Sequence, residues 1–319
     1  MSLGTHELVP GQLAVDIVAH QAGSMRCWSF VSRGLAEFGQ REIVLTLSAG
    51  LDDNPNAPPT APLSYYKTVY QLTAQGNLVD EQGFTGFGGA GMLGAMGLAY
   101  GRAIALDGVS IPPDSLAAVM LTGPEAALAN SIGTTRVLTR LGRAYRYYPH
   151  PFWSDRGRQS VVAPNEQTLL SSVAIARVPG ACASLDQTMV NLRLPRSAVP
   201  VLASLAQVPP NAGVGLMCGI DYDAGGHFVW APGQQGPEAI QASAGPDRQL
   251  QPGQLSRMGG SFVMFVPEQQ ADSGQLFEDG FAFMLSDPSW ARFRQALMAG
   301  RPGNLAAAPG ALSLSLQWT

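Results

Sequence analysis

One stretch near the start of the chain constrains the fold more than any other, because it has the pattern of two strands joined by a turn. Residues 27–31 alternate large apolar with small polar side chains, as in a strand with one buried face. Residues 43–47 form an apolar, partly β-branched run suited to lie beside it. Gly34 and Gly39 lie between the two and can take positive φ. Trp28, the largest apolar side chain here, is predicted to anchor a first core.

The rest of the first half mixes further strand signals with helical periodicity. Helices are predicted over residues 63–74, 124–131 and 134–141. Strands are predicted over residues 13–19, 102–106 and 116–121. The glycine-rich segment 83–101 is predicted to be irregular or weakly extended, and the first residues, including His6, to be disordered.

The second half contains a repeated strand–Pro–helix unit. Residues 188–194 read as a strand that Pro195 ends, with a helix over 197–206; residues 281–285 precede a helix that starts at Asp287-Pro288 and runs to 298. We therefore predict an α+β fold with two mixed, mainly antiparallel sheets and helices on one face, packed as one compact unit. The two halves are placed at residues 1–160 and 161–319.

Composition excludes several classes of protein. Charged residues make up only 13% of the chain and the net charge is -4, which gives no bulk attraction to nucleic acid or anionic lipid. Glycine or proline interrupts the long uncharged stretches, and no secretory leader is visible, so no membrane span is predicted. The odd number of cysteines suggests free thiols in a reducing compartment and a cytoplasmic protein: Cys27, Cys182 and Cys218.

Two short motifs suggest ligand chemistry, but each also has a simple structural interpretation. Residues 89–94 fit Gly-x-Gly-x-x-Gly, yet no strand precedes them and no helix is expected after them, so a glycine loop is favoured over a dinucleotide site. Asp221, Asp223 and His227 could hold a metal, but their spacing also suits a hairpin turn, which is the favoured interpretation. With no Gly-x-Ser-x-Gly motif either, we predict no enzyme, no catalytic residue and no cofactor.

An arginine cluster with aromatic neighbours is the strongest candidate site in the sequence. Arginine and aromatic side chains together are typical of protein-interaction surfaces. The predicted partner-binding residues are Arg143, Arg146, His150 and Arg156, chosen from a run that also holds Arg136, Arg140 and Arg158. The alternative is that these arginines form internal salt bridges to Glu125, Asp155 or Glu166.

Three spaced blocks carry a resemblance to a known family. They are Arg26-Cys27-Trp28-x-Phe30 with Gly39-Gln40-x-Glu42-Ile43-Val44, then Arg140-Leu141-Gly142 with Tyr145-Arg146-x-Tyr148-Pro149, and Gly259-x-Ser261-Phe262 with Glu278-Asp279-Gly280. In this order they resemble the C-terminal domain of Smad anchor for receptor activation and endofin. The layout of residues 28–47 is more distantly similar to the suppressor-of-fused domain.

The resemblance implies a non-catalytic protein-interaction or scaffold domain with an unknown protein partner. The FYVE zinc finger and Smad-binding segment of those relatives have no counterpart in this sequence, and no Cys-x-x-Cys pair is present, so phosphoinositide and Smad binding are not expected. Two alternatives stay open. One is an immunity-type protein of the suppressor-of-fused class, and the other is a small-ligand-binding protein or enzyme with a site near segment 83–101.

Overall fold

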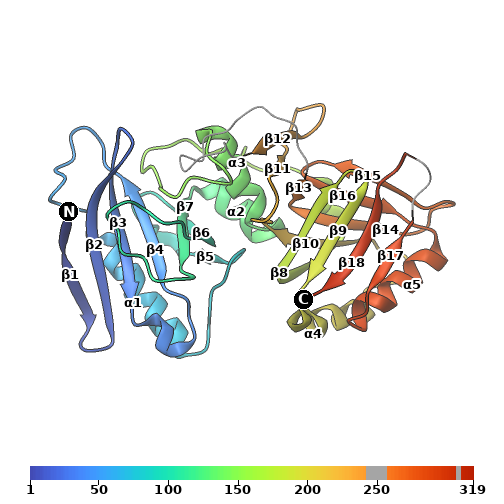
Figure 1. The fold of residues 1–319 in the computed structure, drawn as a ribbon, viewed down its shortest axis with the longest axis horizontal. Coiled ribbons are helices and arrows are strands. Elements are labelled where there is room, and N and C mark those ends of the chain that lie inside the picture. The colour runs from blue at the N-terminus through green and yellow to red at the C-terminus, as the bar shows by residue number, and fades with distance from the viewer. Residues whose placement is uncertain (242–256, 307–309) are drawn as a thin grey trace. The chain divides into compact units, whose positions relative to one another are not determined.

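Two β-sheets organise the chain, one in each of two units (Figure 1). The computed structural model describes residues 1–241, 257–306 and 310–319. Unit 1 contains residues 1–127 and 151–160, and unit 2 contains residues 128–150 and 161–319. The predicted α+β class with two mixed sheets is confirmed. The predicted boundary after residue 160 coincides with one junction between the units, whereas residues 128–150 belong to the second unit.

The sheet of unit 1 has the strand order β1-β2-β3-β4-β7-β6-β5. Neighbouring strands are antiparallel except β4 and β7, which run parallel. Helix α1 (Ala61–Ala74) packs on this sheet through Tyr65, Tyr66 and Val69. The strands are β1 (Ser2–Val9), β2 (Leu13–Ala22), β3 (Met25–Arg33), β4 (Ile43–Ser48), β5 (Phe84–Gly86), β6 (Gly97–Arg102) and β7 (Leu116–Leu121).

The strand pair predicted around Trp28 is confirmed. β3 and β4 are antiparallel neighbours, with Trp28 opposite Leu47. Trp28 is 1% exposed, and its indole Nε1 donates a hydrogen bond to the carbonyl oxygen of Pro55 at 2.8 Å. The expected disorder near His6 is wrong, because β1 pairs along β2 with His6 opposite Val15.

The glycine-rich segment, predicted to be irregular or weakly extended, is extended at both ends. Its two ends form β5 and β6, which pair antiparallel with each other. Gly97 must be glycine, because an added Cβ would lie 2.7 Å from the Phe84 ring and 2.8 Å from the Thr85 carbonyl oxygen. The sequence predicts a strand over residues 102–106. The structure instead has β6 over Gly97–Arg102, so the strand ends where the predicted one begins.

The sheet of unit 2 runs in the order β12-β11-β13-β8-β10-β14-β16-β15, with β9, β18 and β17 continuing from β8. It is mixed: β8–β10, β11–β13, β14–β16 and β9–β18 are parallel pairs. The strands are β8 (Ala174–Asp186), β9 (Met189–Leu194), β10 (Val214–Gly219), β11 (Gly226–Val229), β12 (Glu238–Gln241), β13 (Arg257–Gly260), β14 (Phe262–Val266), β15 (Ser273–Phe277), β16 (Gly280–Met284), β17 (Gly303–Leu305) and β18 (Ser313–Trp318).

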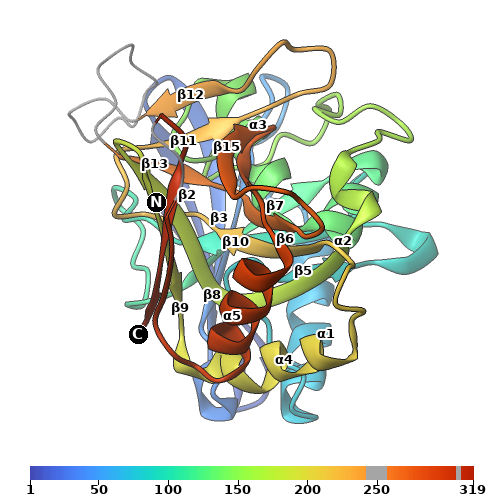
Figure 2. The same cartoon turned by 90° about the vertical axis from the view of Figure 1, so that its right-hand side faces the viewer.

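Both predicted strand–Pro–helix repeats occur in unit 2. β9 leads to the short helix α4 (Val199–Ala203), and β16 leads to α5 (Asp287–Met298). The two helices pack against each other beside the sheet (Figure 2). Trp290 and Phe293 of α5 enter the core with Phe265, whose ring stacks on Trp290 at 5.4 Å between centroids.

Helices α2 (Gly123–Ile132) and α3 (Thr135–Tyr145) precede the second sheet in the chain. α3 packs beside β11, and all of its residues from 135 to 142 are buried. Gly142 allows the following turn to come close, because a Cβ there would lie 2.1 Å from the carbonyl oxygen of Pro149. Among the described residues, no helix combines the length and apolar character that crossing a bilayer requires.

Candidate interaction pocket

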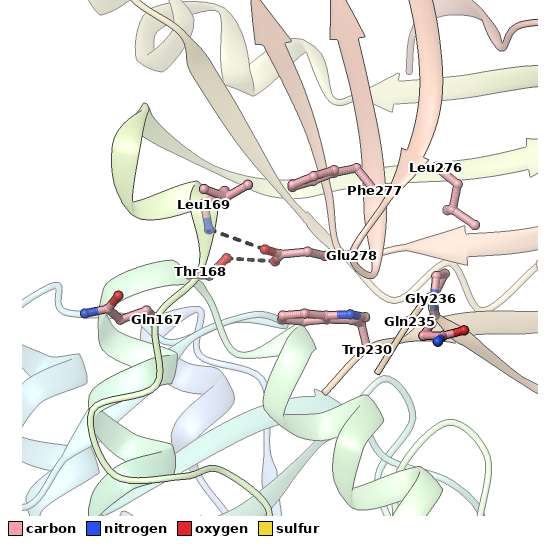
Figure 3. Close-up of a pocket in the computed structure, with 10 residues that line it drawn as sticks. Gln167, Thr168, Leu169, Trp230, Gln235, Gly236, Leu276, Phe277 and Glu278 are labelled. Atoms are coloured by element: carbon pink, nitrogen blue, oxygen red, sulfur yellow. Dashed lines mark hydrogen bonds between the residues drawn. The ribbon is translucent and has the colours of Figure 1, made fainter. Parts of the chain in front are cut away.

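Unit 2 has a pocket of about 480 Å³ next to the turn between β15 and β16 (Figure 3). We call it the Trp230 pocket. This volume is within the range of pockets that hold small-molecule ligands, roughly 300–1,000 Å³. Its lining residues are Gln167, Thr168, Leu169, Trp230, Gln235, Gly236, Pro237, Leu276, Phe277 and Glu278.

The walls of the Trp230 pocket come from three separate chain segments. Trp230 directly follows β11, and Phe277 and Glu278 form the end of β15 and the turn into β16. The turn is tight, with Glu278 at φ 48°. In Figure 3 the ring of Phe277 and the indole of Trp230 lie on opposite sides of the Glu278 side chain. Leu169 is 59% exposed and forms part of the rim.

A buried arginine on α3 holds the acidic wall of the pocket. Arg136 is 1% exposed and forms an ion pair with Glu278, and its Nε donates to Asp279 Oδ1 at 2.6 Å. Its Nη1 also donates to Thr168 Oγ1 at 3.0 Å. Burial opposes the charged guanidinium, but the two carboxylates outweigh this cost and raise the pKa of Arg136. Arg136 is therefore a permanent cation that ties three segments of unit 2 together.

A second arginine one helical turn later fixes the position of Trp230. Arg140 Nε donates to the Trp230 carbonyl oxygen at 2.8 Å, and its Nη1 donates to Glu166 Oε2 at 2.7 Å. Both charged side chains are almost fully buried, at 3% and 2% exposure. The Arg136 guanidinium also lies 5.9 Å from the centre of the Trp230 ring system. The pocket thus has a rigid frame built from buried, paired charges.

Within the described part of the chain, no cysteine, histidine or serine lines the Trp230 pocket. The hydroxyl of Thr168 donates to Glu278 Oε2 at 2.7 Å. The lining offers aromatic faces, apolar rim atoms, two side-chain amides and one carboxylate. Such a surface can bind and orient another molecule, and the carboxylate that contacts the Thr168 hydroxyl is itself held in the ion pair with Arg136.

The structure separates the arginines that the sequence places together. Arg136 and Arg140 are buried in the pocket frame. Arg158 lies in unit 1 and donates to both carboxylate oxygens of Glu125 at 2.5 Å. Two of the internal salt bridges considered from the sequence, to Glu166 and to Glu125, are therefore present.

The four predicted partner-binding residues also differ in their surroundings. Arg143 is 36% exposed and pairs with Glu238, and Arg146 is exposed at the C-terminus of α3 with φ 53°. His150 is buried at 4% exposure. Arg156 belongs to unit 1, where it pairs with Asp53 and lies 5.5 Å from the Trp28 ring centre. Arg143 and Arg146 are thus the two accessible members.

The weak metal candidate forms an ion-pair cluster instead. Asp221 is 3% exposed and accepts from Arg193 at 2.5 Å and from Arg257 at 3.1 Å. His227 is fully buried, its Nδ1 lies 2.7 Å from the Phe228 carbonyl oxygen, and burial lowers its pKa. No three metal-binding side chains come together anywhere in the described ranges. The two aspartates therefore neutralise arginines at the turn between β10 and β11.

The Gly-x-Gly-x-x-Gly motif lies in the antiparallel connection between β5 and β6, not between a strand and a helix. Gly91 and Gly94 have φ of 60° and 85°, and the Met92 and Ala95 backbones bridge across the turn. The favoured interpretation as a flexible or tightly packed glycine loop therefore describes this segment, with close packing at Gly91.

The thiols sit in the interior environments expected for unreactive cysteines. Burial raises the pKa of Cys27 to about 12 and places that of Cys218 well above its usual value. Burial also raises the pKa of Cys182, with the charge of Asp221 adding to the effect. All three are free cysteines.

Sequence reasoning missed the Trp230 pocket because its lining comes from three segments spread over more than a hundred residues, from Gln167 to Glu278. The spacing of Arg136 and Arg140, four residues apart on α3, normally indicates a solvated polar face of an amphipathic helix. Only the fold shows that both are buried, with acids supplied from distant segments.

Comparison with known proteins places the chain in a family. Residues 111–309 match the family described as Smad anchor for receptor activation-like, C-terminal, and the chain belongs to this family. The matched range includes every residue that lines the Trp230 pocket.

The chain is also similar to human "Zinc finger FYVE domain-containing protein 9", with 24% identity over 292 residues. The match covers 85% of this chain and 20% of the relative, so the chain spans about a fifth of that protein. The suppressor-of-fused link stays a prediction.

Proposed function

We propose that this chain is a non-catalytic protein-interaction domain that binds its partner through the Trp230 pocket. The observation that carries the proposal is a half-open pocket with aromatic walls on a frame of buried ion pairs. Aromatic side chains in well-supported pockets are the usual anchors of protein interfaces. Among the described residues the lining holds no cysteine, histidine or serine, and its one carboxylate is ion-paired with Arg136, which favours binding over chemistry.

The family supports the same kind of role. The family is described as Smad anchor for receptor activation-like, C-terminal, which refers to an anchor protein. An anchoring protein needs a stable surface that recognises another protein, and the Trp230 pocket is suited to that task. The partner itself stays unnamed in this proposal.

Arg143 and Arg146 remain proposed partner contacts next to the pocket. Arg143 pairs with Glu238, and Glu238 directly follows Pro237 of the pocket lining. Both side chains are accessible, so they could reach acidic groups of a partner seated over the rim. His150 is buried within unit 2 and Arg156 belongs to unit 1, so this proposed contact surface consists of Arg143 and Arg146.

The direct test is site-specific photo-crosslinking in the native host. A benzoylphenylalanine replaces Leu169 on the rim, and in a matched control it replaces Leu51, which is 95% exposed in unit 1. We expect an adduct with a discrete protein from position 169 that is absent from position 51 and is lost with Trp230→Ala. Equal labelling at both positions, or none at 169, would reject the proposal.

A further inference from the structure

The acidic wall of the Trp230 pocket carries more negative than positive charge. Arg136 is shared by Glu278 and Asp279, so two carboxylates face one guanidinium and one negative charge is left over. The neighbouring pair of Arg140 and Glu166 is balanced and does not offset it. Asp279 is fully buried, whereas Glu278 lines the pocket. The excess negative charge therefore faces a ligand in the pocket through Glu278.

One oxygen of Glu278 retains capacity to accept a hydrogen bond. Oε2 accepts from both Arg136 and Thr168. Oε1 accepts only a long hydrogen bond, 3.3 Å, from the Leu169 backbone N–H among the described residues. A carboxylate oxygen can accept two hydrogen bonds, so Oε1 has room for a further donor. Gln167 and Gln235, both exposed on the rim, add amide oxygens.

The aromatic walls favour a cation of a particular shape. In the view of Figure 3, Phe277 and Trp230 lie on either side of Glu278, so the carboxylate is flanked by aromatic side chains that also line the pocket. Guanidinium is planar, stacks on aromatic rings, and is more weakly hydrated than ammonium. The protein already uses this chemistry from the inside, where Arg136 lies 5.9 Å from the Trp230 ring centre and 5.5 Å from the Phe262 ring centre.

We infer that the Trp230 pocket receives an arginine side chain from an exposed segment of the partner protein. The guanidinium lies between Phe277 and Trp230 and donates to Glu278, and an apolar neighbour of the arginine covers Leu169. This inference rests on the proposed function and gives the partner's chemistry. Charge complementarity and the exposed leucine distinguish such a segment from an acidic or a purely polar one.

The test uses the full chain and peptides that differ at one position. The probe is Ac-Gly-Ser-Leu-Arg-Leu-Ser-Gly-amide, and the comparison peptides carry citrulline, lysine or glutamate in place of the arginine. Citrulline keeps the shape of arginine and removes its charge. Binding is followed by NMR through the Trp230 indole N–H, which Trp230→Phe assigns. We expect the arginine peptide to bind about tenfold or more tightly than the citrulline peptide.

Protein variants make the test specific to the pocket. Glu278→Gln should weaken the arginine peptide about tenfold and leave the citrulline peptide unchanged. Glu37→Gln, at an exposed position of unit 1, makes the same charge change and should have no effect. Glu278→Gln could destabilise unit 2, because Glu278 is paired with Arg136. The comparison of the arginine and citrulline peptides on the unaltered chain tests the inference without that variant. Equal binding of these two peptides, tighter binding of glutamate, or no shift at Trp230 would overturn the inference.

The two proposals can fail separately. A protein adduct at Leu169 without arginine selectivity would support the proposed interaction function and reject the inference that the pocket receives an arginine. Arginine selectivity without any adduct at Leu169 would show that the pocket prefers a guanidinium group and would reject the proposed binding of a protein partner.

Discussion

Replacing Arg136 tests whether the pocket frame is held by its buried charge. Arg136→Met keeps most of the side-chain volume and removes hydrogen bonds to Glu278, Asp279 and Thr168. It leaves two carboxylates, 7% and 0% exposed, without their counterion. Removing one partner of a buried ion pair costs about 3–5 kcal/mol. We expect a loss of that size in the free energy of unfolding.

Urea denaturation with linear extrapolation measures this loss, and an unchanged slope shows that the unfolded and folded states keep their compactness. Arg143→Met is the matched control on the same helix. Its partner Glu238 is 50% exposed, so this change should cost no more than about 1 kcal/mol.

A double-mutant cycle identifies the cause. Combining Arg136→Met with Asp279→Asn removes one of the stranded charges, so the double variant should lose less than the sum of the two single losses by about 1–3 kcal/mol. A loss below about 1 kcal/mol for Arg136→Met alone would refute the reasoning, because the ion pairs would then not be holding the turn.

Four further results are expected. Trp28→Ala should cost about 3–5 kcal/mol in urea denaturation as a large-to-small core change, and a loss under about 1 kcal/mol would contradict its core role. Arg143→Glu combined with Arg146→Glu should reduce crosslinking at the pocket with little change in melting temperature, whereas a collapse in stability would show that these arginines hold the fold. Arg146→Gly suits the positive φ and should remove the cation without destabilising the chain. Burial lowers the pKa of His227 below 6.5, so its contribution to stability is complete above pH 6.5 and is lost as pH falls from there through the lowered folded value. His227→Gln should therefore flatten the acid side of the stability–pH curve, and an unchanged slope would argue against it.

Local patterns predicted the elements whose signals lie within one segment. The alternation around Trp28 and the Asp287-Pro288 start of α5 needed no distant contact, and both elements are present. β1 was missed because its side chains are mostly exposed, so hydrophobic alternation is absent; the strand is held by pairing with β2. β8 was missed because Pro179 and Gly180 interrupt it.

The structure accommodates Pro179 and Gly180 where the register of β8 against β10 shifts, with Gly180 at φ 76°.

The candidate site was less predictable than the fold. The clustering of arginines in the sequence suggested one arginine surface. The position of each arginine on α3 decides whether it is buried. Only the tertiary fold brings Glu278 and Asp279 to Arg136. A pocket made of distant segments has no local pattern to detect.

The assignment of residues 128–150 to unit 2 has a consequence for how the chain is made. α3 is synthesised before residues 151–160, which complete unit 1, and Arg136 precedes its partner Glu278 by 142 residues. At roughly 5–20 residues per second, the ribosome takes about 7–28 s to cover that distance. During this delay Arg136 has no acids to meet, whereas Arg140 meets Glu166 after only 26 residues. Unit 2 therefore closes around Arg136 only when its last hairpins emerge. A fragment that starts at residue 161 never receives the guanidinium, and it should be the harder half of this protein to produce alone.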